Sequence, residues 1–470
     1  MKKLLLLISF AVSTQFASYA QEQQQSSVVA PQNAEVVKPA SENSEDMVKP
    51  KNGGKVKLKP YGFVRNYYFY DSRQITQSNA GLSNRIPKDE LWNEAGDEDL
   101  NAVSQSSFLA ISTRFGLNLS GLRVLNADVT AKAEGDFCGF SSSNTMIRLR
   151  HAYGKLQWQH NALLIGQTYT PFFAEYSPEV LSHAAGSPFQ PESRSPQIRY
   201  EGSVDGWKFT AAAVWQFQYQ SWGPDGKSSK YQLYAHVPEF VIGFDYKNDR
   251  GFTIGAGVDI STIRPRTQYE TSYTVGVIKD TIWNADKSGY DRIEERDSTI
   301  KTKRLVKELF TSASPMFFID YKNKENTFHI LFKSIYGQNV AHFNMYSGYG
   351  VSKINEDGTQ EYKPLRSLTN FVDLSWGKKF RGNFFAGYMK NFGASEDFVG
   401  DIYTLDKIKN IDYLWRVSPA ISYTVSKFTF GLEYELTGVG YGDNVESNGS
   451  VKADRDVLNH RASAMIKFAW

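Results

Sequence analysis

Apolar and polar residues alternate with a period of two along most of the chain after Lys55. In residues 207–220, aromatic residues and alanines gather on one face, while the other face carries mainly Lys, Thr and Gln. In residues 127–137, Ala, Val and Phe alternate with the charged residues Asp128, Lys132, Glu134 and Asp136. A helix has a period of 3.6, so the pattern predicts β-strands. Runs of about 10 to 15 residues suit strands that cross a bilayer at a tilt better than the shorter strands of soluble sheets.

The connections between these strands alternate between short and long. Short connections are expected near residues 120–122, 159–160, 203–206, 248–251, 323–326, 378–382 and 425–427. Long ones are expected near 72–106, 171–195, 220–232, 265–307, 338–366, 393–411 and 438–456, and a single upper connection, 139–143, is short. This alternation predicts an all-β fold, a transmembrane antiparallel β-barrel of about sixteen strands with short periplasmic turns and long extracellular loops.

Aromatic residues and the two ends of the chain fit the same prediction. Aromatic residues make up 14% of the chain and flank the short connections, as in the aromatic girdle of a membrane interface. Residues 1–20 are predicted to be a signal peptide, with Met1-Lys2-Lys3 before an apolar stretch and Ser18-Tyr19-Ala20 at the cleavage site. Residues 21–54 predict a disordered periplasmic leader, and residues 55–470 the barrel. The last strand ends in Trp470, where we expect the barrel assembly machinery to bind.

Composition mainly excludes other classes of protein. A net charge of +3 gives no reason to expect a nucleic-acid partner. The single cysteine, Cys138, excludes an intramolecular disulfide framework and any site with several cysteine ligands. A mean hydropathy of −0.44 fits a soluble protein and a β-barrel equally well. No catalytic centre, cofactor or metal site is predicted.

The predicted barrel is too wide for side chains to fill, so a water-filled lumen is expected. Its polar loops are expected to lie in water. Charged residues with inward parity are the predicted pore lining, although simple solvation of a wet wall would also explain each of them: Arg114, Asp128, Lys132, Glu134, Arg148, Arg150, Arg199, Lys208, Arg416 and Glu433. Residues 172–194 are the predicted constriction loop, with an ordinary surface loop as the alternative; its charged residues are Glu175, Glu179, Glu192 and Arg194.

Four segments resemble a known family: Lys59 to Tyr67, Arg148 to Tyr153, Ile165 to Thr168 and Asn459 to Trp470. They are similar to porin-like outer-membrane proteins of the Bacteroidota, and more distantly to phosphate-selective and dicarboxylate porins with sixteen strands. The resemblance spans about Lys55 to Trp470 and implies a passive diffusion channel, often a homotrimer, whose third loop forms the constriction. The sequence departs from the phosphate-selective pattern, because residues 172–194 contain no dense run of lysine or arginine.

The function expected is therefore that of a bacterial outer-membrane porin for small hydrophilic solutes and ions, in contact with membrane lipid and lipopolysaccharide. One alternative is a surface adhesin or receptor that uses the long extracellular loops, since residues 265–307 contain an alternating stretch that could form a hairpin. The other is an outer-membrane hydrolase. None of the seven histidines lies in a recognisable nucleophile or metal-helix motif, which disfavours an enzyme.

Overall fold

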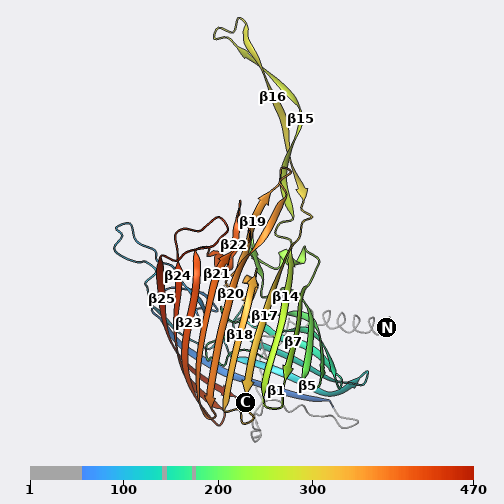
Figure 1. Cartoon of the computed structure of the whole chain (residues 1–470), viewed down its shortest axis with the longest axis vertical. Helices are drawn as coiled ribbons and strands as arrows, with labels where there is room; N and C mark the ends of the chain where they lie inside the picture. The colour runs from blue at the N-terminus through green and yellow to red at the C-terminus, as the bar shows by residue number, and fades with distance from the viewer. Residues whose placement is uncertain (1–55, 140–145, 172–175) are drawn as a thin grey trace, which may run out of the picture. The chain divides into compact units, whose positions relative to one another are not determined.

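The computed structural model describes residues 56–139, 146–171 and 176–470. Sixteen long strands form a closed antiparallel sheet in which β1 pairs with β25 on one side and β5 on the other (Figure 1). The barrel strands are β1 (Lys57–Asp71), β5 (Arg114–Val124), β6 (Ala127–Asp136), β7 (Arg148–Gln157), β8 (Asn161–Tyr169), β9 (Arg194–Val204), β10 (Trp207–Val214), β13 (Glu239–Lys247), β14 (Phe252–Ile263), β17 (Phe310–Lys322), β18 (Phe328–Gln338), β20 (Gln360–Gly377), β21 (Phe380–Gly393), β23 (Ile411–Val425), β24 (Phe428–Tyr441) and β25 (Arg455–Ala469). The predicted all-β barrel is confirmed, whereas the predicted signal peptide and leader lie outside the described residues.

The remaining elements belong to the long connections. They are β2 (Ile75–Ser78), β3 (Ser83–Pro87), β4 (Gln105–Leu109), β11 (Ser221–Gly223), β12 (Gly226–Ser228), α2 (Lys230–Leu233), β15 (Gln268–Trp283), β16 (Tyr290–Leu305), η1 (Ala341–Phe343), β19 (Gly348–Ile354), β22 (Ile402–Thr404) and η2 (Leu405–Lys407). The expected hairpin in residues 265–307 is present, since β15 and β16 pair as a two-stranded sheet (Figure 1). Among the described residues, no helix has the length and apolar character needed to cross a membrane.

Of two short turns predicted from the sequence, the structure contains one and not the other. Asp205 and Gly206 have φ values of 48° and 83°, which is the left-handed geometry of a tight hairpin turn. The turn predicted at residues 120–122 is wrong. The ladder between β5 and β6 shifts register between Leu119 and Leu122, so these residues form a β-bulge, and the strand continues to a turn at Leu125 and Asn126.

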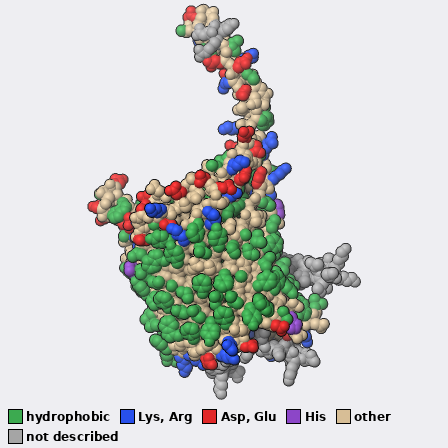
Figure 2. All heavy atoms as spheres, viewed as in Figure 1, with side chains coloured by type: hydrophobic (Ala, Val, Ile, Leu, Met, Phe, Trp, Pro, Cys, Tyr) green, Lys and Arg blue, Asp and Glu red, His purple; other side chains and the backbone are tan. Residues whose placement is uncertain are grey.

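Alternation along each strand separates an apolar outer wall from a polar inner wall. On β24, Phe428, Phe430 and Leu432 are exposed on the outside, while Glu433 and Glu435 are buried on the inside. Figure 2 shows hydrophobic side chains over the outer wall, with charged groups concentrated toward its ends. Aromatic rings from neighbouring strands meet near the short turns, as Phe428 and Phe468 do with centroids 4.9 Å apart. The outer wall is therefore suited to contact lipid, and the polar groups that can contact a solute lie on the inner wall.

Candidate functional site in the lumen

The inner face of β6 and β7 carries acids bound by arginines. Asp136 lies opposite Arg148, and a bulge between Glu134 and the next residue leaves Arg150 without a partner in the ladder. Arg150 donates from Nε to Glu134 Oε1 at 2.8 Å and from Nη1 to Asp136 Oδ2 at 2.9 Å. Arg148 Nη2 also donates to Asp136 Oδ2, at 2.8 Å. The bulge thus turns a second arginine toward the two acids.

The third loop, residues 170–193, reaches inner-wall residues of well-separated strands. Tyr67 on β1 donates its hydroxyl hydrogen to the carbonyl of Leu181 at 2.7 Å. Lys333 on β18 donates to the carbonyl of Tyr176, also at 2.7 Å, and Arg416 on β23 binds a further carbonyl of the loop at 3.0 Å. Because these strands occupy different positions around the sheet, the described part of the loop lies across the lumen. Glu175 lies outside the described residues.

Glu179 joins the third loop to the wall by its charge. Its carboxylate accepts a hydrogen bond from Arg381 Nε at 2.7 Å and lies 3.1 Å from Nδ1 of His329. Its backbone N–H donates to Asp373 at 3.0 Å. Burial opposes ionisation, but the contact with His329 and the charge of Arg381 lower the pKa of Glu179 to about 2. Glu179 is therefore an anchor of this loop.

The other end of the loop is held by Glu192. Tyr219 donates to its carboxylate at 2.7 Å, and Nη1 of Arg194 lies 3.6 Å away. The backbone N–H of Glu192 donates to the carbonyl of Phe343 at 2.9 Å. Phe343 belongs to residues 339–347, a second segment that folds inward and is largely buried.

A third inward segment is the β2–β3 hairpin of the first loop. Arg85 makes two hydrogen bonds to Asp406, of 2.9 and 3.0 Å. Tyr441 donates to the carbonyl of Pro87 at 2.6 Å, and Ile86 is fully buried. The expectation that every long loop lies in water is wrong for this hairpin, because wall side chains satisfy its backbone carbonyls inside the barrel.

These insertions divide the predicted pore-lining residues into two groups. One group is buried against other protein groups: Glu134, Arg150, Arg416 and Glu433. The other is half-buried: Arg114, Asp128, Lys132, Arg148, Arg199 and Lys208. Glu433 accepts a hydrogen bond from Ser418 at 2.7 Å, and Asp128 lies 3.4 Å from Arg123 close to the turn. The space available to a solute therefore borders the half-buried group more than the buried one.

Further along the inner wall, acid Glu201 lies among basic residues. Lys155 donates to it at 3.0 Å, and Nη1 of Arg199 lies 3.4 Å from it. Lys208 also acts on Glu201 electrostatically. Lys132 lies 3.6 Å from Glu134, so each acid on this side of the lumen has at least one cation beside it.

Five arginines on this side form what we call the basic cluster: Arg65, Arg114, Arg148, Arg150 and Arg194. Burial, followed by the charges of Arg65, Arg114, Arg148 and Arg150, lowers the pKa of His183 in the third loop well below its ordinary value. The imidazole is therefore neutral at physiological pH. Four of these arginines thus act on one point of the third loop, and the fifth, Arg194, lies beside Glu192 of the same loop.

Several hydrogen-bond donors of the basic cluster remain unused. In the part of the chain that the structure describes, Nε and Nη2 of Arg194 and Nε of Arg114 have no hydrogen-bond partner. The Arg194 guanidinium lies over the rings of Tyr169 and Tyr219, 5.4 and 5.2 Å from their centroids. Although these atoms are buried, the positive charges of Arg114 and Arg194 contribute to the electrostatic potential on this side of the lumen.

Sequence reasoning missed Arg65, Arg85, His183 and Arg381. Arg65 shares its strand face with Phe63, Tyr67 and Phe69, so alternation gave that face an apolar character. Arg85 and His183 lie in connections, where no periodicity indicates direction. Inward folding of those connections depends on contacts between residues far apart in the sequence, such as Arg85 with Asp406.

Comparison with known proteins agrees with this architecture. A family model described as DcaP outer membrane protein matches residues 14–229, somewhat less than half of the chain. The crystal structure of the outer membrane channel DcaP of Acinetobacter baumannii aligns with a TM-score of 0.57, covering 90% of this chain and 99% of that chain at 16% identity. The chain is a porin-like outer-membrane barrel.

Two other solved structures align with this porin-like barrel at lower scores. In-vitro folded OmpT, an outer membrane protein of Vibrio cholerae, has a TM-score of 0.47 and 12% identity, covering 88% of this chain and 98% of that chain. The anion-selective porin from Comamonas acidovorans has a TM-score of 0.46 and 10% identity, covering 88% and 100%. No curated protein matches the chain.

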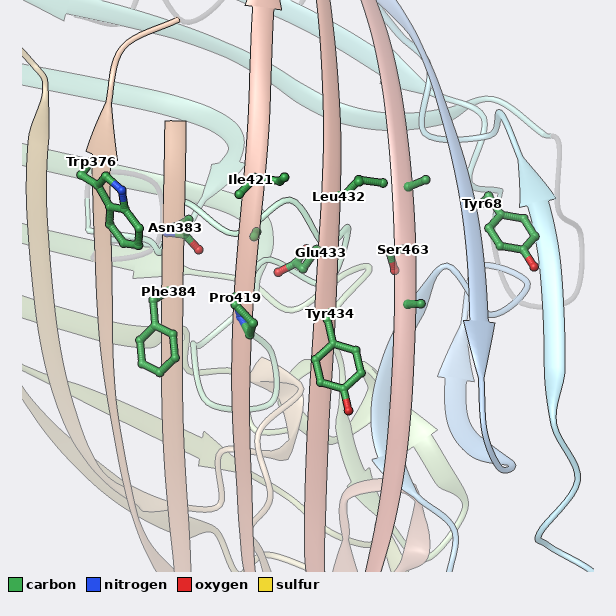
Figure 3. A pocket seen from close by; sticks show the side chains of 13 residues that line it. Tyr68, Trp376, Asn383, Phe384, Pro419, Ile421, Leu432, Glu433, Tyr434 and Ser463 are labelled. Carbon is green, nitrogen blue, oxygen red and sulfur yellow. The ribbon is translucent and has the colours of Figure 1, made fainter. Parts of the chain in front are cut away.

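The outer wall of the porin-like barrel also contains a groove. Figure 3 shows Trp376, Phe384, Ile421 and Tyr434 along it, on β20, β21, β23 and β24. The outward residues of β25 at this groove are small alanines, which leave the space open. Its lining is mainly aromatic and aliphatic and suits lipid or another apolar surface, so the polar lumen remains the candidate site.

Proposed function

We propose that the porin-like barrel is a passive diffusion channel for small hydrophilic solutes and ions, with a preference for anions. The observation that supports this proposal is the basic cluster: five arginines lie beside the third loop, and among the described residues only Glu134, Asp136 and Glu192 pair with them by charge. Charge of one sign in a narrow passage with low-dielectric walls raises the local concentration of the opposite ion. No bond is made or broken in this function.

Reversal potentials in a planar bilayer test the proposal. A potassium chloride gradient across the purified protein is expected to give stable ohmic steps and a permeability ratio that favours chloride. The double variant R114Q/R194Q removes two positive charges of the basic cluster. Its permeability ratio of chloride to potassium is therefore expected to fall toward one. R250Q, which removes a positive charge from an exposed turn outside the basic cluster, is the control and should keep the wild-type ratio. A silent bilayer would refute the channel, and an unchanged ratio in the double variant would refute the role of the cluster.

We also propose that the chain is a porin-like protein of the Bacteroidota type and that three copies associate as a homotrimer, in contact with lipid and lipopolysaccharide. The family resemblance of the sequence supports this proposal, as does an outer wall that is apolar over much of its area. The mass of the detergent-solubilised protein tests it: the 470-residue chain has a mass of 53.1 kDa, and a trimer is expected to have three times the mass of one processed chain without its detergent.

A further inference from the structure

Three buried side chains from different parts of the chain meet on one side of the lumen. Glu239 begins β13, Asp259 lies on β14, and His342 lies in η1 within the inward segment 339–347. One ligand atom from each lies within 4.8 Å of the others, and Nε2 of His342 is 3.0 Å from Oε2 of Glu239. Each residue is at most 2% exposed, so bulk water does not solvate them.

The charges of this cluster differ from those of the other buried acids. Glu134 and Asp136 contact Arg150, and Asp71 and Glu435 contact Arg461. Glu239, by contrast, interacts with both Asp259 and His342, and no lysine or arginine of the described residues pairs with either carboxylate. Two carboxylates buried together cost several kcal/mol unless a cation or a proton offsets their charge.

Unused hydrogen-bonding atoms converge on the same place. Within the described ranges, Oε2 of Glu239, Oδ1 of Asp259 and both ring nitrogens of His342 lack a hydrogen-bond partner. The short distance between Glu239 and His342 therefore does not have hydrogen-bond geometry. Buried polar atoms are nearly always satisfied, so this group indicates a missing ligand.

We propose that Glu239, Asp259 and His342 bind one divalent transition-metal ion. One imidazole and two carboxylates are ligands typical of zinc and its neighbours, whereas calcium and magnesium prefer oxygen alone. Donor atoms around a tetrahedral zinc lie about 3.3 to 3.6 Å apart, so small side-chain rotations from the present spacing would bring these three donors into three of the four ligand positions. A positive ion also neutralises the two carboxylates.

The ion would cross-link the inward segment to the wall. His342 is the only one of the three ligands that lies outside a barrel strand, and its neighbour Phe343 accepts the hydrogen bond from Glu192 of the third loop. Metal binding at His342 therefore fixes the position of 339–347 and, through Glu192, one end of the third loop. This inference does not depend on the anion preference proposed above.

Metal content of the folded, full-length protein tests the proposal. The protein is dialysed against a chelator, loaded with ZnCl2, passed over a desalting column and analysed by inductively coupled plasma mass spectrometry. We expect one zinc ion per chain. H342A should retain less than a tenth of this amount, whereas H160A, which removes a surface histidine, should retain all of it. Less than a tenth of an equivalent in the wild type, or full loading of H342A, would overturn the proposal.

A second probe separates loss of metal from loss of fold. E239Q and D259N keep the size of each side chain, and the heat-dependent migration of each variant on a gel reports whether the barrel is closed. Cobalt(II) loaded into the wild type should give the visible absorption of a protein-bound ion, and the folded variants should not. Folded variants with an unchanged cobalt spectrum would contradict the site.

Discussion

Glu179 links one end of the third loop to the wall through Arg381 and His329. Because the contact with His329 and the charge of Arg381 outweigh burial, its pKa falls from an ordinary 4.5 to about 2. The charged form thus favours the docked loop. This stabilisation is complete above about pH 4.5 and is lost as the pH falls toward 2.

E179Q is therefore expected to release this end of the third loop at neutral pH. Loss of a charged partner from this half-buried contact costs about 2 kcal/mol. Single-channel recordings at pH 7 should show added current fluctuations in E179Q, and the wild type should acquire them only well below pH 4.5. E325Q, at an exposed turn, is the control. Quiet currents in E179Q would mean that the backbone contacts hold the loop without the carboxylate.

Among the elements, the β2–β3 hairpin occupies lumen space. Its backbone is held by Arg416 and Tyr441, and Ile86 packs in the same buried cluster as Phe189 of the third loop. Replacing residues 75–87 by a short Gly-Ser linker should leave the barrel closed and increase its single-channel conductance.

The matched control for that deletion is the tip of the β15–β16 hairpin, residues 284–289. This hairpin pairs as a separate two-stranded sheet, so shortening its tip should leave the conductance unchanged. Equal conductance for both deletions would show that the β2–β3 hairpin does not narrow the conducting path.

The elements also show what the sequence could predict. Strands follow from alternation, because one face meets lipid and the other the lumen, and Asp205-Gly206 specifies its turn locally. Ser120-Gly121 has the same local appearance, but there the ladder tolerates a bulge and the strand continues. Local composition cannot distinguish these outcomes, because the pairing of β5 with β6 decides between them.

The lumen could be predicted only in part for a similar reason. Strand parity gives the inward direction of Arg114, Arg148 and Glu134. It cannot show that a connection folds inward, since this depends on partners hundreds of residues away, such as Asn84 with Glu435. The candidate metal site could not be predicted for the same reason, because His342 meets Glu239 and Asp259 only when the segment 339–347 folds into the barrel.

At the scale of the whole molecule, the barrel is closed by the pairing of its first and last strands. β1 and β25 pair from Phe63 with Ala469 to Asp71 with Arg461. Beyond that ladder, the backbone N–H of Trp470 donates to the carbonyl of Gly62 at 3.1 Å. A side chain at Gly62 would collide with the indole, since an added Cβ would lie 2.4 Å from it. Trp470 thus extends the seam by one residue.

We propose two roles for Trp470, as a contact of the finished seam and as a residue of the last strand that the barrel assembly machinery binds. Its side chain is 51% exposed, and that of Trp376 on β20, away from the seam, is 50% exposed. If stability alone matters, W470A and W376A should lower the unfolding temperature and the cellular yield together.

We predict instead that W470A reduces the amount of folded barrel in the outer membrane far more than W376A does. Refolded in detergent, the two variants should unfold at similar temperatures, because each loses one exposed indole. The measurements are heat-modifiable gel migration of membrane fractions and thermal unfolding of the refolded proteins. Equal membrane yields would remove the assembly role and leave Trp470 as one aromatic residue of the girdle.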